Sequence, residues 1–162
     1  MEKAFKTLAD KIITTEELNF ILQEINQIHN LVFKETNKLL SKKLDEIKNQ
    51  KLKTALEKWE KDKIISNIPS QQAQFLEDLK KYLQQIPQIR MQVARPLPSG
   101  FLKKLALWFQ KETGKKIILE VIFDPKVVGG VALEYQGKYY NLSLAKEIDK
   151  IIEEKRIKGL AL

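Results

Sequence analysis

The first 68 residues carry apolar side chains at helical spacing and contain neither Gly nor Pro. Steps of three and four keep side chains on one face of a helix, so this region is predicted to be helical. Thr14 followed by Glu17 indicates a capping box, which separates a short helix over about residues 3–12 from a longer one. The apolar positions of the longer segment are Leu18, Ile21, Leu22, Ile25, Ile28, Val32, Leu40, Leu44, Ile47, Leu52, Ala55, Leu56 and Trp59.

The length of this second helix is left open by the pattern. Unbroken, it would span about 50 residues, or roughly 75 Å at a rise of 1.5 Å per residue. A helix of that length is typical of a stalk or a coiled coil. The periodicity slips at residues 30–37, where Asn30, Thr36 and Asn37 are poor helix formers, so the alternative is a helix that breaks there.

Prolines end the helical region. Pro69 disfavours helix at Ile68, and Ser70 is expected to cap a further helix over residues 71–85, which Pro87 ends. This places a domain boundary after residue 87.

From residue 88 the pattern changes to short strands. Residues 89–93 alternate between apolar and polar side chains, as in a half-buried strand. Ser99 is expected to cap an amphipathic helix that ends at a left-handed Gly114. Strands follow over residues 115–123, 131–135 and 138–142, with turns at residues 124–130 and 136–137. Ser143 is expected to cap a last helix, whose apolar face comprises Leu144, Ile148, Ile151 and Ile152.

The predicted fold class is therefore α+β. A helical domain over residues 1–87, built of long helices or a small bundle, precedes a small β-α-β-β-β-α domain over residues 88–162. Trp59 and Trp108 each fall on the apolar face of a helix and are expected in the core.

Composition narrows the class of protein. With 43% hydrophobic and 31% charged residues, the chain can build a core. No apolar run approaches the roughly 18 residues of a membrane span, and we expect no transmembrane segment and no secretion signal. The absence of Cys excludes disulfides and thiolate sites.

The formal charge of +8 suggests nucleic acid, acidic lipid or an acidic protein as partner. Acidic and basic residues are interleaved, however, which favours solvated helix faces.

Signals for catalysis are weak. His29 is the only histidine, and no HExxH, GxSxG or phosphate-loop motif occurs. Gly129 and Gly130 precede a strand, whereas a phosphate loop precedes a helix, so a bulge is the better interpretation. Tyr135, Tyr139 and Tyr140 are expected to pair across a hairpin. We expect no catalytic, cofactor-binding or metal-binding residue.

The order of motifs over residues 88–155 resembles the F-type ATP synthase delta subunit family, which includes the oligomycin-sensitivity-conferring protein. Val93 ends a strand, Gly114 and the lysines after it start another, and an Asp-Pro-x-hydrophobic-hydrophobic-Gly-Gly segment follows. The residues that carry this motif are Asp124, Pro125, Val127, Gly129, Gly130 and, before the last helix, Ser143. Residues 1–87 resemble the family less closely.

This resemblance implies a non-catalytic connector that joins the catalytic alpha/beta hexamer to the peripheral stalk. In the family, the helical domain holds N-terminal helices of alpha subunits and the C-terminal domain holds the C-terminal segment of b subunits. It also implies a peripheral position on the cytoplasmic face of a membrane complex, without nucleic acid and without homo-oligomers. The residues expected at partner surfaces, or against neighbouring elements of the chain itself, are Leu18, Ile21, Leu22, Ile25, Val32, Leu144, Ile148, Ile151 and Ile152.

Three alternatives stay open at this point. The layout is also similar to E-type stalk subunits of V/A-type ATPases. A basic nucleic-acid-binding module with a coiled-coil arm would bind with a steep dependence on salt. A homodimeric coiled-coil scaffold would join through residues 40–59.

Overall fold

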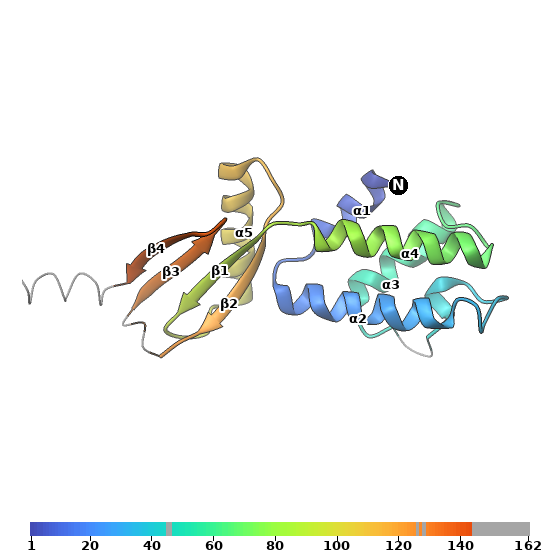
Figure 1. Ribbon diagram of the computed structural model, residues 1–162, viewed down its shortest axis with the longest axis horizontal. Helices are drawn as coiled ribbons and strands as arrows, with labels where there is room; N and C mark the ends of the chain where they lie inside the picture. The colour runs from blue at the N-terminus through green and yellow to red at the C-terminus, as the bar shows by residue number, and fades with distance from the viewer. Residues whose placement is uncertain (45–46, 126, 128, 144–162) are drawn as a thin grey trace, which may run out of the picture. The chain divides into compact units, whose positions relative to one another are not determined.

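The computed structural model describes residues 1–44, 47–125, 127 and 129–143 (Figure 1). The chain divides into two units, Met1–Pro87 and Gln88–Leu162. The first is helical and the second combines a mixed sheet with a helix, which confirms the predicted α+β class.

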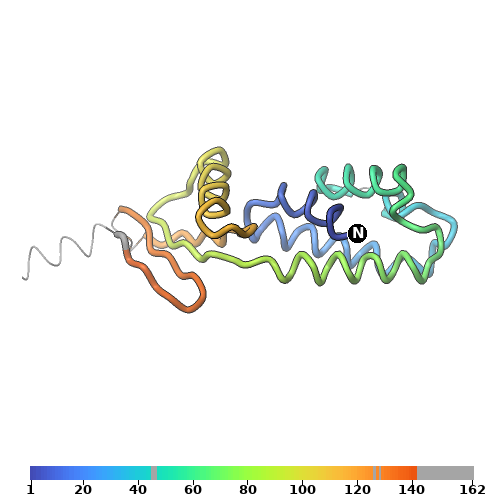
Figure 2. Tube along the Cα trace, turned by 90° about the horizontal axis from the view of Figure 1, so that it is seen from above, coloured from blue at the N-terminus to red at the C-terminus, as the bar shows by residue number. Residues whose placement is uncertain are grey.

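The first unit is a bundle of short helices. Its helices are α1 (Glu2–Ala9), α2 (Thr15–Leu31), α3 (Gln50–Lys61) and α4 (Pro69–Gln84), with a 3-10 turn η1 (Leu40–Lys42) before α3. Figures 1 and 2 show α2 and α4 side by side and running in opposite directions. The buried side chains between the helices include Phe5, Leu8, Leu18, Ile21, Ile25, Ile28, Val32, Leu40, Leu52, Leu56, Trp59, Phe75, Leu76 and Leu79.

The structure decides the length that the pattern left open: α2 ends at Leu31, and no continuous 50-residue helix forms. The end falls at the start of the segment in which the periodicity slips. Here the buried ammonium of Lys43 donates hydrogen bonds to the backbone oxygens of Val32 and Glu35, so the chain after α2 is held in a turn. The homodimeric coiled-coil scaffold is contradicted by a second observation. Its supposed seam, which includes Leu52, Leu56 and Trp59, is buried inside the unit.

The helix starts agree only partly with the sequence. Thr14 caps α2 as expected, with its Oγ1 accepting a hydrogen bond from the Glu17 amide at 3.3 Å. The Glu17 carboxylate accepts from the amide of Ile13, one residue before the cap. Ser70 and Ser99 make no capping hydrogen bond, contrary to expectation. A proline begins α4 in place of a capping serine: the helix starts at Pro69 itself, because the fixed φ of proline suits the first helical position.

The second unit is built on a four-stranded sheet in the order β2-β1-β3-β4. Its elements are β1 (Gln88–Val93), α5 (Ser99–Thr113), β2 (Ile118–Phe123), β3 (Gly130–Tyr135) and β4 (Lys138–Ser143). β1 and β2 pair in parallel, joined by α5 as the crossover, while β3 pairs antiparallel with both β1 and β4.

The turns at Gly114 and at residues 136–137 lie where the sequence predicts them. Gly114 ends α5 in the left-handed region, with φ of 68°. Gln136 and Gly137 both have positive φ, which gives the tight turn between β3 and β4. The expected last helix, with Leu144, Ile148, Ile151 and Ile152, lies outside the described residues. Ser143, which was expected to cap it, is the last residue of β4.

The two tryptophans have different surroundings. Trp59 is buried, as expected, with 3% of its surface exposed. The expectation for Trp108 is wrong, because 53% of its surface is exposed. The face of α5 that turns inward carries Ala106 and Phe109, and Trp108 lies beyond the edge of that face.

Candidate partner-binding groove

An open groove lies between α1 and α3, with a volume of about 340 Å³. Residues spaced by three and four on α1 form one wall, and residues spaced by one and four on α3 form the other. Several of them are small, so the two helices leave room for another element. The lining residues are Met1, Lys3, Ala4, Thr7, Leu8, Lys11, Thr54, Ala55, Lys58, Trp59, Asp62 and Ile64.

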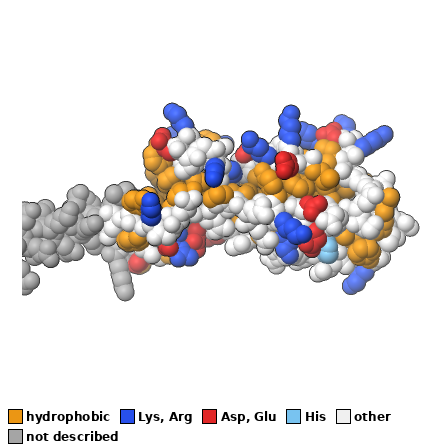
Figure 3. All heavy atoms as spheres, turned by 45° about the horizontal axis from the view of Figure 1, so that its top comes forward, with side chains coloured by type: hydrophobic (Ala, Val, Ile, Leu, Met, Phe, Trp, Pro, Cys, Tyr) orange, Lys and Arg blue, Asp and Glu red, His pale blue; other side chains and the backbone are white. Residues whose placement is uncertain are grey.

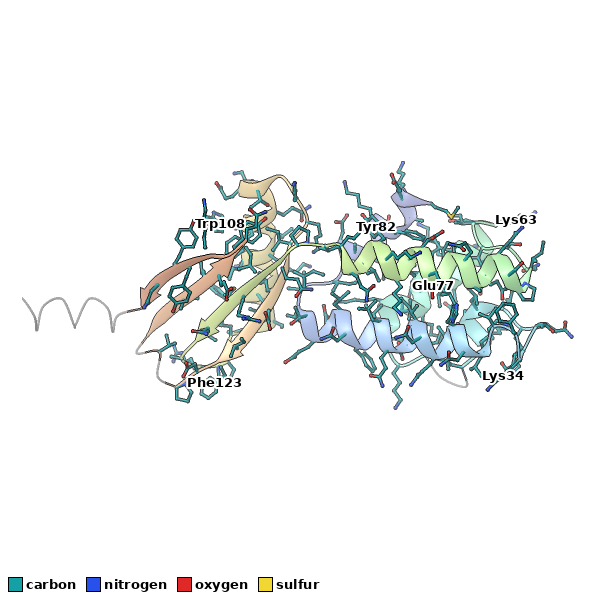
Figure 4. The ribbon with its side chains drawn as sticks, in the orientation of Figure 1. Lys34, Lys63, Glu77, Tyr82, Trp108 and Phe123 are labelled. Atoms are coloured by element: carbon teal, nitrogen blue, oxygen red, sulfur yellow. The ribbon has the colours of Figure 1, made fainter. Side chains whose placement is uncertain are left out.

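An aromatic cluster holds the two walls together. The Phe5 ring of α1 lies 6.1 Å from that of Trp59 on α3, and 5.2 Å and 5.7 Å from those of Phe75 and Tyr82 on α4. Trp59 and Phe75 are 5.5 Å apart in an edge-on arrangement. Such edge contacts are favourable beyond the area that they bury. Trp59 therefore belongs to the core and to the lining of the groove at once. Figure 4 labels Tyr82 on α4.

The position of α3 is fixed by a buried carboxylate. Glu24 of α2 is 3% exposed, and its oxygens accept hydrogen bonds from the amides of Lys48 at 2.7 Å and Asn49 at 3.2 Å. Asn49 in turn caps α3, since its Oδ1 accepts from the amides of Lys51 and Leu52. A charged group buried in this way is stabilised only when it is hydrogen-bonded.

Two further contacts tie α3 to its neighbours. The Lys51 ammonium donates to the Glu17 carboxylate at 2.6 Å and to the Lys11 carbonyl at 2.7 Å. Burial raises the pKa of Glu17, but hydrogen bonds from Lys51 and from the Ile13 amide, with the charge of Lys51, outweigh it, so that the pKa lies below its usual value. At the other end of α3, the Glu60 carboxylate accepts from the amide of Ser41 at 2.9 Å and from its hydroxyl at 2.6 Å.

The rim of the groove is mostly basic. Lys3, Lys11 and Lys58 are exposed there, and Asp62 is the one acidic residue among the lining residues. The floor is apolar, because Leu8, Ala55 and Trp59 are buried there. An apolar floor between basic rims suits an amphipathic helix that carries acidic residues.

The residues predicted for the partner surface of α2 are placed mainly in the core. Leu18, Ile21, Ile25 and Val32 are buried within the unit, and Leu22 is half-buried. They support the bundle and do not line the groove. The lining was missed because small residues such as Ala4 and Ala55 give little hydrophobic signal. Glu24 was missed as well, although its position three residues after Ile21 and four before Ile28 lies on the apolar stripe.

The glycine motif of the second unit shapes a turn between β2 and β3. The Asp124 amide donates to the Val93 carbonyl at 3.0 Å, and the Val127 amide donates to the Asp124 carbonyl at 3.1 Å. Gly129 and Gly130 both have positive φ, of 68° and 73°, a conformation that side chains with a Cβ rarely adopt. Pro125 is exposed and Val127 is buried. This geometry fits a structural role for the motif.

Arg90 and His29 each lie beside acidic side chains at the surface. Arg90 on β1 bridges Glu120 on β2 at 2.8 Å and Glu134 on β3 at 3.4 Å. His29 is half-buried, with its Nε2 3.8 Å from the carboxylate of Glu77, which Figure 4 labels on α4. Within the residues that the structure describes, no three His, Asp or Glu side chains gather as a metal site would require.

Comparison with known proteins identifies the family. The sequence model of the ATP synthase delta (OSCP) subunit family matches residues 1–154. The "ATP synthase subunit delta" of Geobacter sp. (strain M21) is 34% identical over 56 residues, which are 35% of this chain and 31% of the relative. The aligned segment thus spans about a third of that relative. The family match covers both units and selects the delta family over E-type stalk subunits, so the chain belongs to the ATP synthase delta (OSCP) subunit family.

Proposed function

We propose that this chain is a non-catalytic connector in the peripheral stalk of an F-type ATP synthase. It would hold the catalytic alpha/beta hexamer to the b-subunit stalk, on the cytoplasmic face of the complex, and so keep the hexamer from turning with the rotor. Membership of the delta family supports a stalk subunit. Among the described residues, no helix combines the length and apolarity that a membrane span requires.

The groove between α1 and α3 is the observation that carries this proposal. A connector under torque needs apolar contact area on a rigid support, and the groove has a buried floor at Leu8 and Trp59. Its small wall residues admit a helix at close range. We assign this groove to an N-terminal helix of an alpha subunit. The basic rim favours a helix with acidic residues and would speed association more than it deepens affinity.

Binding of a synthetic peptide with the alpha N-terminal sequence from the same genome tests this assignment. Thr54→Trp fills the groove from α3, because Thr54 lines it and is exposed. Glu57→Trp is the control, because it places the same indole at an exposed position of α3 outside the lining. Calorimetry should show binding by the native chain and by Glu57→Trp, and a loss of at least about tenfold for Thr54→Trp, as expected when a central contact is blocked. Equal affinity in all three proteins would remove the groove from the proposal.

A further inference from the structure

One end of the helical unit is built by turns from separate parts of the chain. α2 and α4 run in opposite directions, with His29 Nε2 3.8 Å from the Glu77 carboxylate, so the turns after α2 and the segment before α4 lie at the same end. Ser41 of η1 is hydrogen-bonded to Glu60 near the end of α3, which brings η1 there as well. Residues 32–44 and 60–69 make up this turn end.

Exposed apolar side chains gather at the turn end. Among the described residues of the first unit, six large apolar side chains are exposed, and four of these belong to the turn end: Phe33, Leu39, Ile64 and Ile68. Phe33 is 63% exposed and Ile68 is 53% exposed. Figure 3 shows hydrophobic side chains beside lysines at this end, on the right of the view. Single exposed apolar residues are common on protein surfaces, but a group of large ones marks an interaction site.

Lysines dominate the exposed charge of the turn end. Asp62 is the one exposed acidic residue within residues 32–44 and 60–69, and Glu35 is half-buried with its carboxylate 3.2 Å from Lys38 Nζ. Figure 4 labels Lys34 and Lys63, which come from the turns after α2 and after α3. The turn end is therefore apolar and positively charged at once. Its exposed lysines are Lys34, Lys38, Lys42, Lys61 and Lys63.

The turns that carry Phe33 are already ordered in the free chain. The Glu35 amide donates to the Leu31 carbonyl at 2.9 Å. The buried Lys43 ammonium donates to the carbonyls of Val32 and Glu35. Because the backbone on both sides of Phe33 is held by these bonds, binding through this side chain costs little conformational entropy.

We propose that the turn end binds the surface of an anionic phospholipid bilayer. Phe33 and Ile68 enter the interface, while Lys34 and Lys63 keep their ammonium groups at the level of the lipid phosphates. Each lysine held near such a surface strengthens binding by about fivefold. This contact concentrates the free chain at a membrane and needs no other protein.

A bilayer fits the turn end better than a protein or a nucleic acid does. The apolar side chains come from separate turns, so they offer a partner helix or strand no continuous row to pack against. A fluid lipid interface needs no such row. Phe33 is the one aromatic residue among the four, whereas single strands of nucleic acid stack on several rings. Residues 1–87 also contain no arginine, the side chain that most often reads nucleic acid.

The inference goes beyond the proposed function, which places the chain on a protein complex and assigns it no lipid. Phe33, Lys34, Lys63 and Ile68 do not line the groove between α1 and α3. Variants of the turn end therefore leave the residues of the groove unchanged, and the two surfaces can be tested separately in the full chain.

The experiment measures co-sedimentation of the full chain with vesicles of equal parts phosphatidylglycerol and phosphatidylcholine, and with vesicles of phosphatidylcholine alone. The native chain should bind the anionic vesicles, bind the neutral ones far less, and be released from the anionic vesicles by salt. Phe33→Ser should weaken binding to the anionic vesicles by at least about fivefold, because an apolar side chain no longer enters the interface. Lys34→Glu/Lys63→Glu should weaken it by at least about tenfold.

Matched controls carry the same substitutions elsewhere. Phe20→Ser changes the exposed phenylalanine of α2, and Lys6→Glu/Lys103→Glu gives the same net charge as the test variant. Both controls should bind within about twofold of the native chain. Thermal melts verify that every variant folds, and the charge variant decides the question if Phe33→Ser is unstable.

Fluorescence locates the contact. Phe33→Trp places an indole at the turn end, and brominated acyl chains should quench it, whereas the indole of Phe20→Trp should stay unquenched. Trp59 is buried and adds a constant background. Trp108 is exposed on α5 and would be quenched if the second unit met the membrane instead.

Three results would overturn the inference. The first is a native chain that does not bind anionic vesicles. The second is equal binding by the native chain and both turn-end variants, or quenching of Trp108 without quenching at position 33. The third is binding of single-stranded DNA or of an acidic peptide, weakened by Phe33→Ser, in place of vesicle binding, which would identify a different occupant. The proposed function stands in all three cases, because it is tested by the alpha peptide.

Discussion

The buried carboxylate of Glu24 predicts a measurable coupling between α2 and α3. In Glu24→Ala, the amides of Lys48 and Asn49 lose their acceptor at the point where α3 begins. A hydrogen bond to a charged group contributes about 1.5–3 kcal/mol. The two bonds share one carboxylate, and water can reach the exposed Lys48. We therefore expect Glu24→Ala to lower the free energy of unfolding by less than the sum of the two bonds, about 2–4 kcal/mol. Glu24→Gln keeps one acceptor oxygen and should cost about half as much.

Chemical denaturation measures this change, with Gln23→Ala as the control because Gln23 is the exposed neighbour of Glu24 on α2. The control should stay within about 0.5 kcal/mol of the native chain. Hydrogen exchange supplies a local readout, since the amides of Lys48 and Asn49 should exchange faster in Glu24→Ala than in the control. A loss below about 0.5 kcal/mol in Glu24→Ala, with unchanged exchange, would refute the assignment of Glu24 as the support of α3.

Three other predictions concern single residues. Lys43→Met removes the donor to the Val32 and Glu35 carbonyls and should cost about 1–3 kcal/mol in urea unfolding; the exposed Lys42→Met should cost almost nothing, and equal effects would contradict a specific role for Lys43. Because the pKa of Glu17 is lowered in the folded chain, its contribution to the free energy of unfolding is fully present above about pH 4.5, the pKa of this group in the unfolded chain. That contribution is lost as the pH falls through the folded pKa. The stability difference between the native chain and Glu17→Gln should shrink over that window, and a difference independent of pH would disprove the linkage. Gly130→Val forces a branched side chain to a φ of 73° and should lower the free energy of unfolding by about 1–3 kcal/mol; an unchanged melting temperature would show that the glycine is not required.

Much of the fold is readable from the sequence because local rules decide it. The alternation at β1, the left-handed Gly114 and the capping Thr14 each act over a few residues, and all are found in the structure. The order of strands and turns after residue 88 also resembles the family closely enough to indicate it.

The parts that sequence reasoning misjudged depend on distant contacts. Periodicity alone does not show that α2 ends at Leu31, since the chain beyond it is held by a lysine eleven residues away from Val32. Trp108 falls on an apolar stripe that is wider than the sheet can cover, so the pattern overstates its burial. The groove arises where small residues on two helices face each other, and that pairing exists only after folding.

The central claim is that the chain connects the hexamer to the stalk, and coupling in a reconstituted ATP synthase from the same genome tests it most directly. A complex depleted of its own delta subunit would be supplied with the native chain, with Thr54→Trp, or with the control Glu57→Trp. The account predicts that the native chain and Glu57→Trp restore ATP-driven proton pumping, and that Thr54→Trp restores it much less at equal protein concentration. Failure of the native chain to bind the complex or to restore any pumping would contradict the account.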